Sequence, residues 1–107
     1  MGAPPKLTLE ERRAALAKAA HSRKVRAQFK AEIKTGVRHW LEAFHSTDEA
    51  IKKMRVKELL QALPGCGEIR AAAILERAGI SSARRVQGVG RSQYESLRKI
   101  LKEVEAR

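Results

Sequence analysis

Residues 59–75 read LLQALPGCGEIRAAAIL, and residues 84–93 read RRVQGVGRSQ. Each stretch holds a turn marked by two glycines, Pro64-Gly65-Cys66-Gly67 in the first and Gly88-Val89-Gly90 in the second, and each turn leads into a predicted helix. The first amides of a helix have no acceptor within it and carry the positive end of its dipole, so they attract anions. Glycine allows a positive φ or a close approach of the backbone to a phosphate. The two turns therefore predict two phosphate-binding points.

The N-terminal third of the chain predicts one long helix that begins at Thr8 and ends near Lys34. Its first half is rich in alanine and charge, which favours helix but offers little to a core. Val25, Phe29 and Ile33 recur at intervals of four residues, as expected for a face that packs on a core. We therefore expect the first half of this helix to project and the second half to pack.

Shorter helices are predicted for the remainder. The first is a short helix carrying Val37, Trp40, Leu41 and Phe44, all packed on the first helix, and the second starts after Ser46-Thr47-Asp48 and runs through Ile51 and Met54. An apolar stripe from Val56 to Leu63 follows, and then a helix from Ile69 that ends at Gly79. A helical turn from Ser81-Ser82 to Val86 is broken by Gly88-Val89-Gly90, and a Ser92–Glu95 capping box opens the last helix. Alternating apolar and polar runs rich in Val, Ile and Thr are absent from the sequence. The predicted fold class is all-α, with residues 1–34 as a basic helical arm and residues 35–107 as a compact helical domain.

The chain has 107 residues, with 23 Lys and Arg against 12 Asp and Glu, and a net charge of +11. This excess predicts a polyanionic partner, with nucleic acid first and a membrane surface as the competitor. No stretch approaches the roughly 18 apolar residues of a membrane-spanning helix, and the basic N-terminal region lacks the apolar block of a signal peptide. We expect an intracellular protein.

Sequence patterns of catalysis or metal binding are missing. Cys66 is the only cysteine, which excludes an intramolecular disulfide and a multi-cysteine zinc site. It is expected to be a small buried apolar residue, with a redox sensor as the alternative. His21, His39 and His45 lack the spacing of metal ligands, and no nucleophile elbow or Walker loop occurs. The prediction is a protein that is not an enzyme and has no metal and no cofactor. Helical spacing places its four aromatic residues in the core rather than on stacked bases.

The first stretch resembles a helix-hairpin-helix element, and with Gly79-Ile80, Arg84-Arg85-Val86 and Gly88-Val89-Gly90 it resembles the longer helix-two-turns-helix form. Nearly the whole chain is similar to the actinobacterial integration host factors. That resemblance rests also on Leu7-Thr8 with the segment 11–20, and on Lys53-Met54-Arg55-Val56-Lys57 followed by Leu59-Leu60. It implies a long N-terminal helix on a compact helical body, and a nucleoid-associated protein that binds, bends and compacts DNA with little sequence specificity.

By this resemblance the DNA contacts would fall in the two turns. The first-turn candidates are Pro64, Gly65, Cys66, Gly67, Glu68, Ile69, Arg70 and Ala71, and the second-turn candidates are Ser82, Arg84, Arg85, Val86, Gly88, Val89, Gly90, Arg91, Ser92 and Gln93. Lys53, Arg55 and Lys57, and Arg13 and Arg23 on the first helix, are further candidates for phosphate contact, although a solvated surface would explain them too. Two features depart from the family pattern, namely Glu68 where a lysine is usual and a longer segment from Lys99 to Arg107.

The implied partner is double-stranded DNA, with a recombinase of phage integration as a further partner. A monomer in the cytoplasm, at the nucleoid, is expected.

Two alternatives stay open. A small-subunit ribosomal protein that binds RNA through the same two-turn element is similar around Pro64 to Val86, but its arginine-rich extended tail is missing here. A fragment of a DNA glycosylase would need an N-terminal proline and a four-cysteine zinc finger, and the chain has Gly2 after Met1 and a single cysteine.

Overall fold

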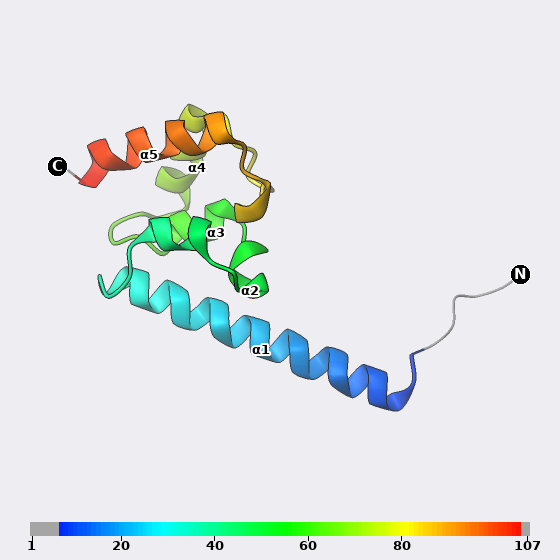
Figure 1. The fold of residues 1–107 in the computed structure, drawn as a ribbon. Coiled ribbons are helices and arrows are strands. Elements are labelled where there is room, and N and C mark those ends of the chain that lie inside the picture. The colour runs from blue at the N-terminus through cyan, green and yellow to red at the C-terminus, as the bar shows by residue number, and fades with distance from the viewer. Residues whose placement is uncertain (1–6, 106–107) are drawn as a thin grey trace, which may run out of the picture.

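One long helix lies along a cluster of shorter helices and runs out beyond it in the computed structural model, which describes residues 7–105 (Figure 1). The elements are α1 (Leu9–Lys34), the 3₁₀ helix η1 (Trp40–His45), α2 (Glu49–Lys52), α3 (Val56–Gln61), α4 (Glu68–Ala78), the 3₁₀ helix η2 (Val86–Gly88) and α5 (Arg91–Glu105). Within residues 7–105 there is no strand, and the one β-type pairing is an isolated antiparallel bridge between Arg55 and Arg85. The all-α prediction is confirmed. The first six residues of the predicted arm lie outside the described residues.

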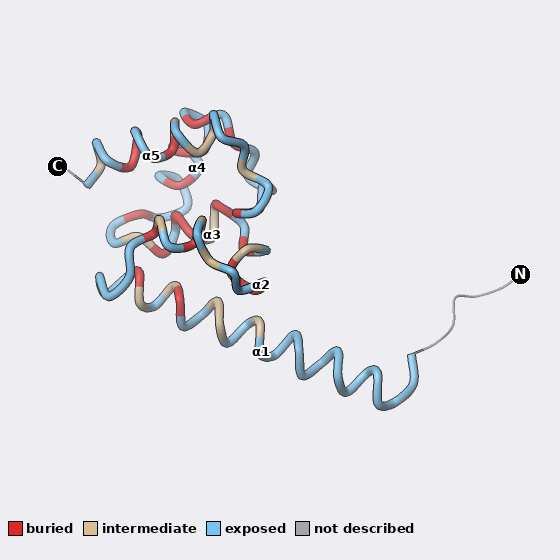
Figure 2. Tube along the Cα trace, in the orientation of Figure 1, coloured by how far each residue is buried: buried red, intermediate tan, exposed pale blue. Residues whose placement is uncertain are grey.

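The two halves of α1 have different surroundings. Every residue from Leu9 to Ala20 is exposed, whereas Phe29 and Ile33 are buried, and Figure 2 shows this change along the helix. Thr8 begins the helix as predicted, because its Oγ1 accepts a hydrogen bond from the Glu11 amide at 3.1 Å. The predicted projecting first half and packed second half are both confirmed.

Among the described residues, no helix is long and apolar enough to cross a membrane.

The core of the body forms where α3, α4 and α5 meet η1 and the end of α1. Its largest fully buried side chains are Met54, Val56, Leu59, Leu60, Leu97 and Leu101. Trp40 is also buried, and its indole Nε1 donates to Glu105 Oε1 at 3.1 Å, which joins the end of α5 to η1. The segment from Lys99 onward therefore contributes to the fold through Glu105.

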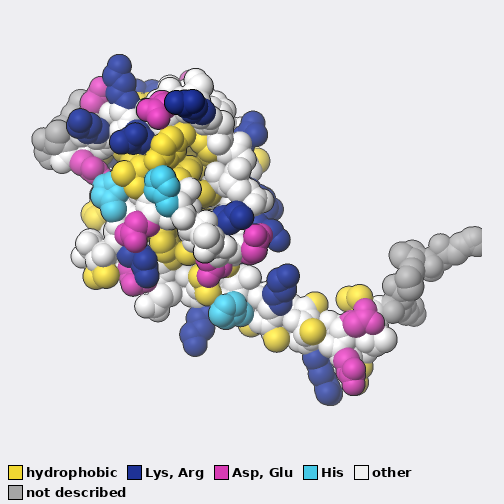
Figure 3. Space-filling model, viewed as in Figure 1, with side chains coloured by type: hydrophobic (Ala, Val, Ile, Leu, Met, Phe, Trp, Pro, Cys, Tyr) yellow, Lys and Arg dark blue, Asp and Glu magenta, His cyan; other side chains and the backbone are white. Residues whose placement is uncertain are grey.

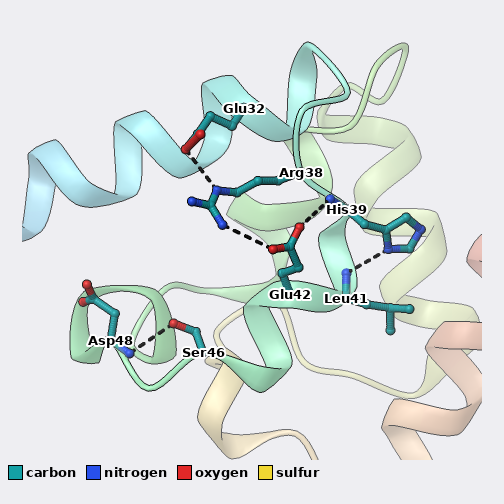
Figure 4. Close-up of polar contacts among 7 residues, drawn as sticks. All are labelled: Glu32, Arg38, His39, Leu41, Glu42, Ser46 and Asp48. Carbon is teal, nitrogen blue, oxygen red and sulfur yellow. Dashed lines mark hydrogen bonds and ion pairs between the residues drawn. The ribbon is translucent and has the colours of Figure 1, made fainter.

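A charged network fixes the angle between α1 and η1 (Figure 4). Arg38 Nε donates to Glu32 Oε1 at 3.0 Å and its Nη1 donates to Glu42 Oε1 at 3.2 Å, while the guanidinium lies over the Phe29 ring. Glu42 Oε2 also accepts from the His39 amide at 3.0 Å, which completes a capping box at the start of η1. The hydrogen bond to Glu32 is the main cause that raises the pKa of Arg38. The arm is thus attached to the body by packing and by ion pairs together.

Two predictions in the middle of the chain are wrong. Val37 was expected to join the apolar cluster, but it is 73% exposed because the chain turns after Lys34 and the next helix starts only at Trp40. The helix that starts after Asp48 ends at Lys52 rather than running through Met54. Met54 is nevertheless buried, and its carbonyl accepts from the Val86 amide at 2.8 Å. The Met54 carbonyl is thus paired with a distant amide, in place of the amide four residues on that a continuing helix would have supplied.

Two predictions around the second turn are also wrong. Ser81 begins only a single turn, closed by the Arg84 amide donating to the Ser81 carbonyl at 3.0 Å, and this turn does not continue through Val86. Arg85 has extended backbone and pairs with Arg55, and the 3₁₀ helix begins only at Val86. The break at Gly88-Val89-Gly90 is present as predicted, because η2 ends at Gly88 and Val89 has extended backbone. The last helix begins at Arg91, ahead of the predicted Ser92–Glu95 capping box.

The two halves of α1 predict different responses to truncation of a large apolar side chain. We expect Ile33→Ala, at a position 3% exposed, to lower the free energy of unfolding by about 2–5 kcal/mol. Leu16→Ala, at a position 69% exposed, should change it by less than about 0.5 kcal/mol. Urea unfolding followed by circular dichroism measures both, and equal losses would show that the arm packs on the body in solution.

Candidate nucleic-acid interface

The first turn is built so that α4 starts at the surface. The Cys66 amide donates to the Leu63 carbonyl at 3.1 Å, which closes a turn with Pro64 and Gly65 at its corner. Gly65 has a φ of +73°, the value that a type II turn requires at its third residue and that glycine adopts without a steric cost. α4 follows at once with Glu68. The Pro-Gly pair of the sequence thus directs the chain straight into the helix.

The amides at the start of α4 have no acceptor. Within residues 7–105, no hydrogen-bond partner is found for the N–H groups of Gly67, Glu68, Ile69 and Arg70, and no side chain caps this helix. A Cβ placed on Gly67 would meet no atom within 4 Å, so the approach to these amides is open. Ile69 is 87% exposed beside them. This combination of open amides and a positive dipole end is suited to an anion.

The two charged side chains of the first turn, Arg70 and Glu68, both have partners within the protein. Arg70 Nη1 donates to the Gly65 carbonyl at 3.3 Å, so the guanidinium lies over the turn. Glu68 lies in the first turn of α4 and its Oε1 accepts from Lys57 Nζ at 3.3 Å. The carboxylate therefore occupies the region that would attract a phosphate and also holds the lysine nearest to it.

The second turn is fastened to the junction between α2 and α3. The Val56 amide donates to the Arg84 carbonyl at 3.0 Å, and the Val86 amide donates to the Met54 carbonyl at 2.8 Å. Arg85 Nη1 adds a bond to the Lys53 carbonyl at 3.0 Å. These bonds join two basic segments that lie about thirty residues apart in sequence.

The Arg84 side chain connects the two ends of the second turn. Its Nη1 donates to the Gly88 carbonyl at 3.2 Å, and a Cβ on Gly88 would lie only 3.2 Å from Arg84 Cδ. A side chain at position 88 would therefore crowd this arginine, and Gly88 does not have a positive φ. Of the four glycines in the two turns, only Gly65 uses a positive φ.

The start of α5 repeats the arrangement at α4. Within the described residues, the amides of Arg91, Ser92 and Gln93 have no acceptor. The Gly90 amide is engaged, because Gln93 Oε1 accepts from it at 3.0 Å. Gln93 Nε2 donates in turn to the Gly79 carbonyl at 2.8 Å. Its side chain therefore belongs to the internal hydrogen bonding of the second turn.

The structure brings some of the predicted residues together at the surface, and others face inward. Arg55, Lys57, Glu68 and Ser82 line one shallow hollow, and Arg84, Arg85 and Gly88 line a second; Ala83 lies in both. Gln87, which sequence analysis did not single out, lines the second hollow, and its place between Arg85 and Gly88 is the signal that would have found it. The candidates with buried side chains are Cys66, Ala71 and Val86, and Val89 is half-buried. The exposed candidates in the two turns are Pro64, Gly65, Gly67, Glu68, Ile69, Arg70, Ser82, Arg84, Arg85, Gly88, Gly90, Arg91 and Ser92.

The basic residues of the arm form a separate surface. Arg13 and Arg23 are exposed on α1, which packs mainly against α2. Figure 3 shows Lys and Arg side chains both along the arm and over the body. Lys53 is exposed and belongs to the body, and its carbonyl is the acceptor for Arg85. Within the described part of the chain, no group of three His, Cys, Asp or Glu residues could hold a metal ion.

Comparison with known proteins identifies the class first. Residues 34–101 match the family model of the S13-like H2TH domain, a helix-two-turns-helix fold, and the match includes both turns. The solved structure of sIHF bound to an 8-base-pair palindromic DNA has a TM-score of 0.75 and 41% sequence identity to this chain. The alignment of the two structures covers 78% of this chain and 97% of the solved sIHF chain.

The similarity to individual proteins extends through the arm. The integration host factor of Streptomyces coelicolor is 45% identical over 103 residues, which cover 91% of this chain and 92% of that protein. The integration host factor of Mycolicibacterium smegmatis is 40% identical over 95 residues, covering 87% and 90%. The chain belongs to the actinobacterial integration host factor family. The resemblance drawn from the sequence is confirmed.

Cys66 is 9% exposed and lies in the core cluster, which confirms the prediction of a small buried apolar residue. Burial raises the pKa of its thiol, and the Arg70 guanidinium opposes this in part. Because the thiolate is the reactive form, we expect iodoacetamide at pH 8 to modify Cys66 more slowly in the native protein than in urea. The native rate should rise as the pH rises through the elevated pKa. Mass spectrometry of quenched samples measures both rates, and equal rates would contradict the burial.

Proposed function

We propose that this protein binds double-stranded DNA through the starts of α4 and α5, with little sequence preference, and that it bends or compacts the bound duplex. The observation that carries this proposal is the pair of helix starts whose amides lack acceptors among residues 7–105 and are flanked by arginines. A solved relative bound to DNA supports it. The groups available are amides and guanidiniums, which suit phosphate oxygens.

Low specificity follows from the chemistry of these groups. Contacts to phosphate fix the position of a protein on a duplex but carry no base information, so the sequence preference should come from how easily the DNA deforms. The site comprises the exposed candidates of the two turns, with Arg55 and Lys57 beside them. Arg13 and Arg23 extend contact along α1, so residues 1–34 act as a basic arm and residues 35–107 as the main DNA-binding domain.

The remaining parts of the proposal concern the setting. We place the protein at the nucleoid as a monomeric, non-catalytic architectural factor that uses no cofactor and that assists a recombinase in phage integration. Its high positive charge suits a polyanionic partner. Structured RNA is the competing ligand, because the segment from Pro64 to Val86 also resembles a small-subunit ribosomal protein that binds RNA.

Salt dependence tests the proposed mechanism. If about 6 phosphates are neutralised, affinity for a 20- to 30-base-pair duplex should fall by roughly 10³ between 50 and 200 mM salt. Fluorescence anisotropy with two duplexes of unrelated sequence should give the same slope for both. A slope near zero would exclude phosphate contacts, and displacement of the duplex by an equal concentration of structured RNA would favour the RNA-binding alternative.

Glu68 should weaken the first turn, because its carboxylate repels phosphate and holds Lys57. We expect Glu68→Gln to bind duplex DNA several-fold more tightly and with a steeper salt slope, since Lys57 becomes available to a phosphate. Glu103→Gln is the matched control, because this exposed carboxylate pairs with Arg77 near the C-terminal ends of α5 and α4, whereas Glu68 lies at the start of α4. If both variants gain equally, only the net charge matters; if neither gains, Glu68 does not face the DNA.

A further inference from the structure

Gln93 uses both polar ends of its side chain inside the protein. Oε1 accepts from the Gly90 amide at 3.0 Å, and Nε2 donates to the Gly79 carbonyl at 2.8 Å. Gly90 is the residue before α5, and Gly79 is the left-handed C-cap of α4, with a φ of +70°. A single half-buried side chain therefore joins the end of one helix to the beginning of the next.

The Gly79 end of this link is itself rigid. The Gly79 amide donates to the Glu76 carbonyl at 3.2 Å, and the Ile80 amide donates to the Leu75 carbonyl at 2.9 Å, which is the closed pattern of a Schellman C-cap. Ile80 is buried in the core. The Gly79 carbonyl is therefore a fixed point to which Gln93 can attach the second turn.

The link has a geometric consequence for the two turns. The open amides of the first turn lie at the start of α4, and Gln93 attaches the second turn at the end of α4. α4 has 11 residues, which corresponds to about 16 Å. The separation of the two amide groups is thus set by the length of α4 and by the side chain that connects its end to α5.

We infer that Gln93 is a positioning residue that holds the second turn at a fixed distance and angle from the first, so that both turns engage phosphates of one duplex together. This inference rests on the proposed function. Two binding points on one rigid frame gain affinity, because the second contact forms without a further loss of orientational freedom. Without the link, each turn keeps its amides but the pair loses its fixed spacing.

The test compares variants by two independent measurements. Gln93→Met keeps the side-chain length and removes both hydrogen bonds, while Gln28→Met makes the same change at an exposed position of α1. Arg91→Ala removes an exposed guanidinium at the start of α5 and serves as the contact-type variant. The measurements are the exchange rate of the Gly90 amide without DNA, by NMR, and the affinity for one duplex across a salt series.

We expect Gln93→Met to expose the Gly90 amide to faster exchange and to weaken binding about tenfold at every salt concentration, with the salt slope unchanged, because no phosphate contact is removed. Arg91→Ala should lower the slope by about 0.9, and Gln28→Met should change nothing. Gln93→Asn, which is too short to reach both partners, should behave as Gln93→Met does and serves if the methionine variant does not fold.

The outcomes separate this inference from the proposed function. A wild-type protein that binds no duplex would overturn the proposed function and the inference with it. Wild-type binding with unchanged affinity in both Gln93 variants would overturn the inference alone. A lowered slope in the Gln93 variants, equal to that of Arg91→Ala, would make Gln93 a phosphate contact and would also overturn it.

Discussion

The starts of α4 and α5 present backbone amides that have no acceptor among the described residues, and the rest of the body holds them in place. Burying such groups without a partner would be costly, so they must face solvent or a ligand. The structure keeps both at the surface by fastening the chain just before each helix. The Leu63–Cys66 turn does this for α4, and the pairing of residues 54–56 with 84–86 does it for α5. Each fastening uses hydrogen bonds that leave the helix amides free.

Glu68 and Lys57 show how a single residue can serve the helix and oppose a ligand at the same position. A carboxylate in the first turn of a helix interacts favourably with the dipole, so Glu68 suits α4 as a helix while opposing an incoming anion. Its partner Lys57 lies on α3, so the ion pair also links two elements that pack together. Local helix stability and affinity for a polyanion therefore make opposite demands at this one position.

Local sequence was sufficient for some features and insufficient for others, and the difference follows from the range of the interactions. The start of α1 at Thr8, the turn at Pro64-Gly65 and the C-cap at Gly79 depend on residues within a few positions, and all were predicted. The bridge between Arg55 and Arg85 joins distant segments, and no short pattern indicates it. For the same reason the inward role of Gln93 was not predicted, because its acceptor Gly79 belongs to another helix. The resemblance supplied the candidate residues, but only packing shows which side chains are engaged inside.

The exposed half of α1 has a consequence for kinetics. From Leu9 to Ala20 the helix extends about 18 Å, which is longer than the screening distance of about 8 Å at physiological ionic strength. Charges near the N-terminal tip of the helix therefore act on an approaching polyanion independently of the charges on the helical body. On the proposed function, a stiff rod of this kind enlarges the target that a diffusing polyanion can strike, so it would raise the frequency of first encounters in addition to extending the bound contact.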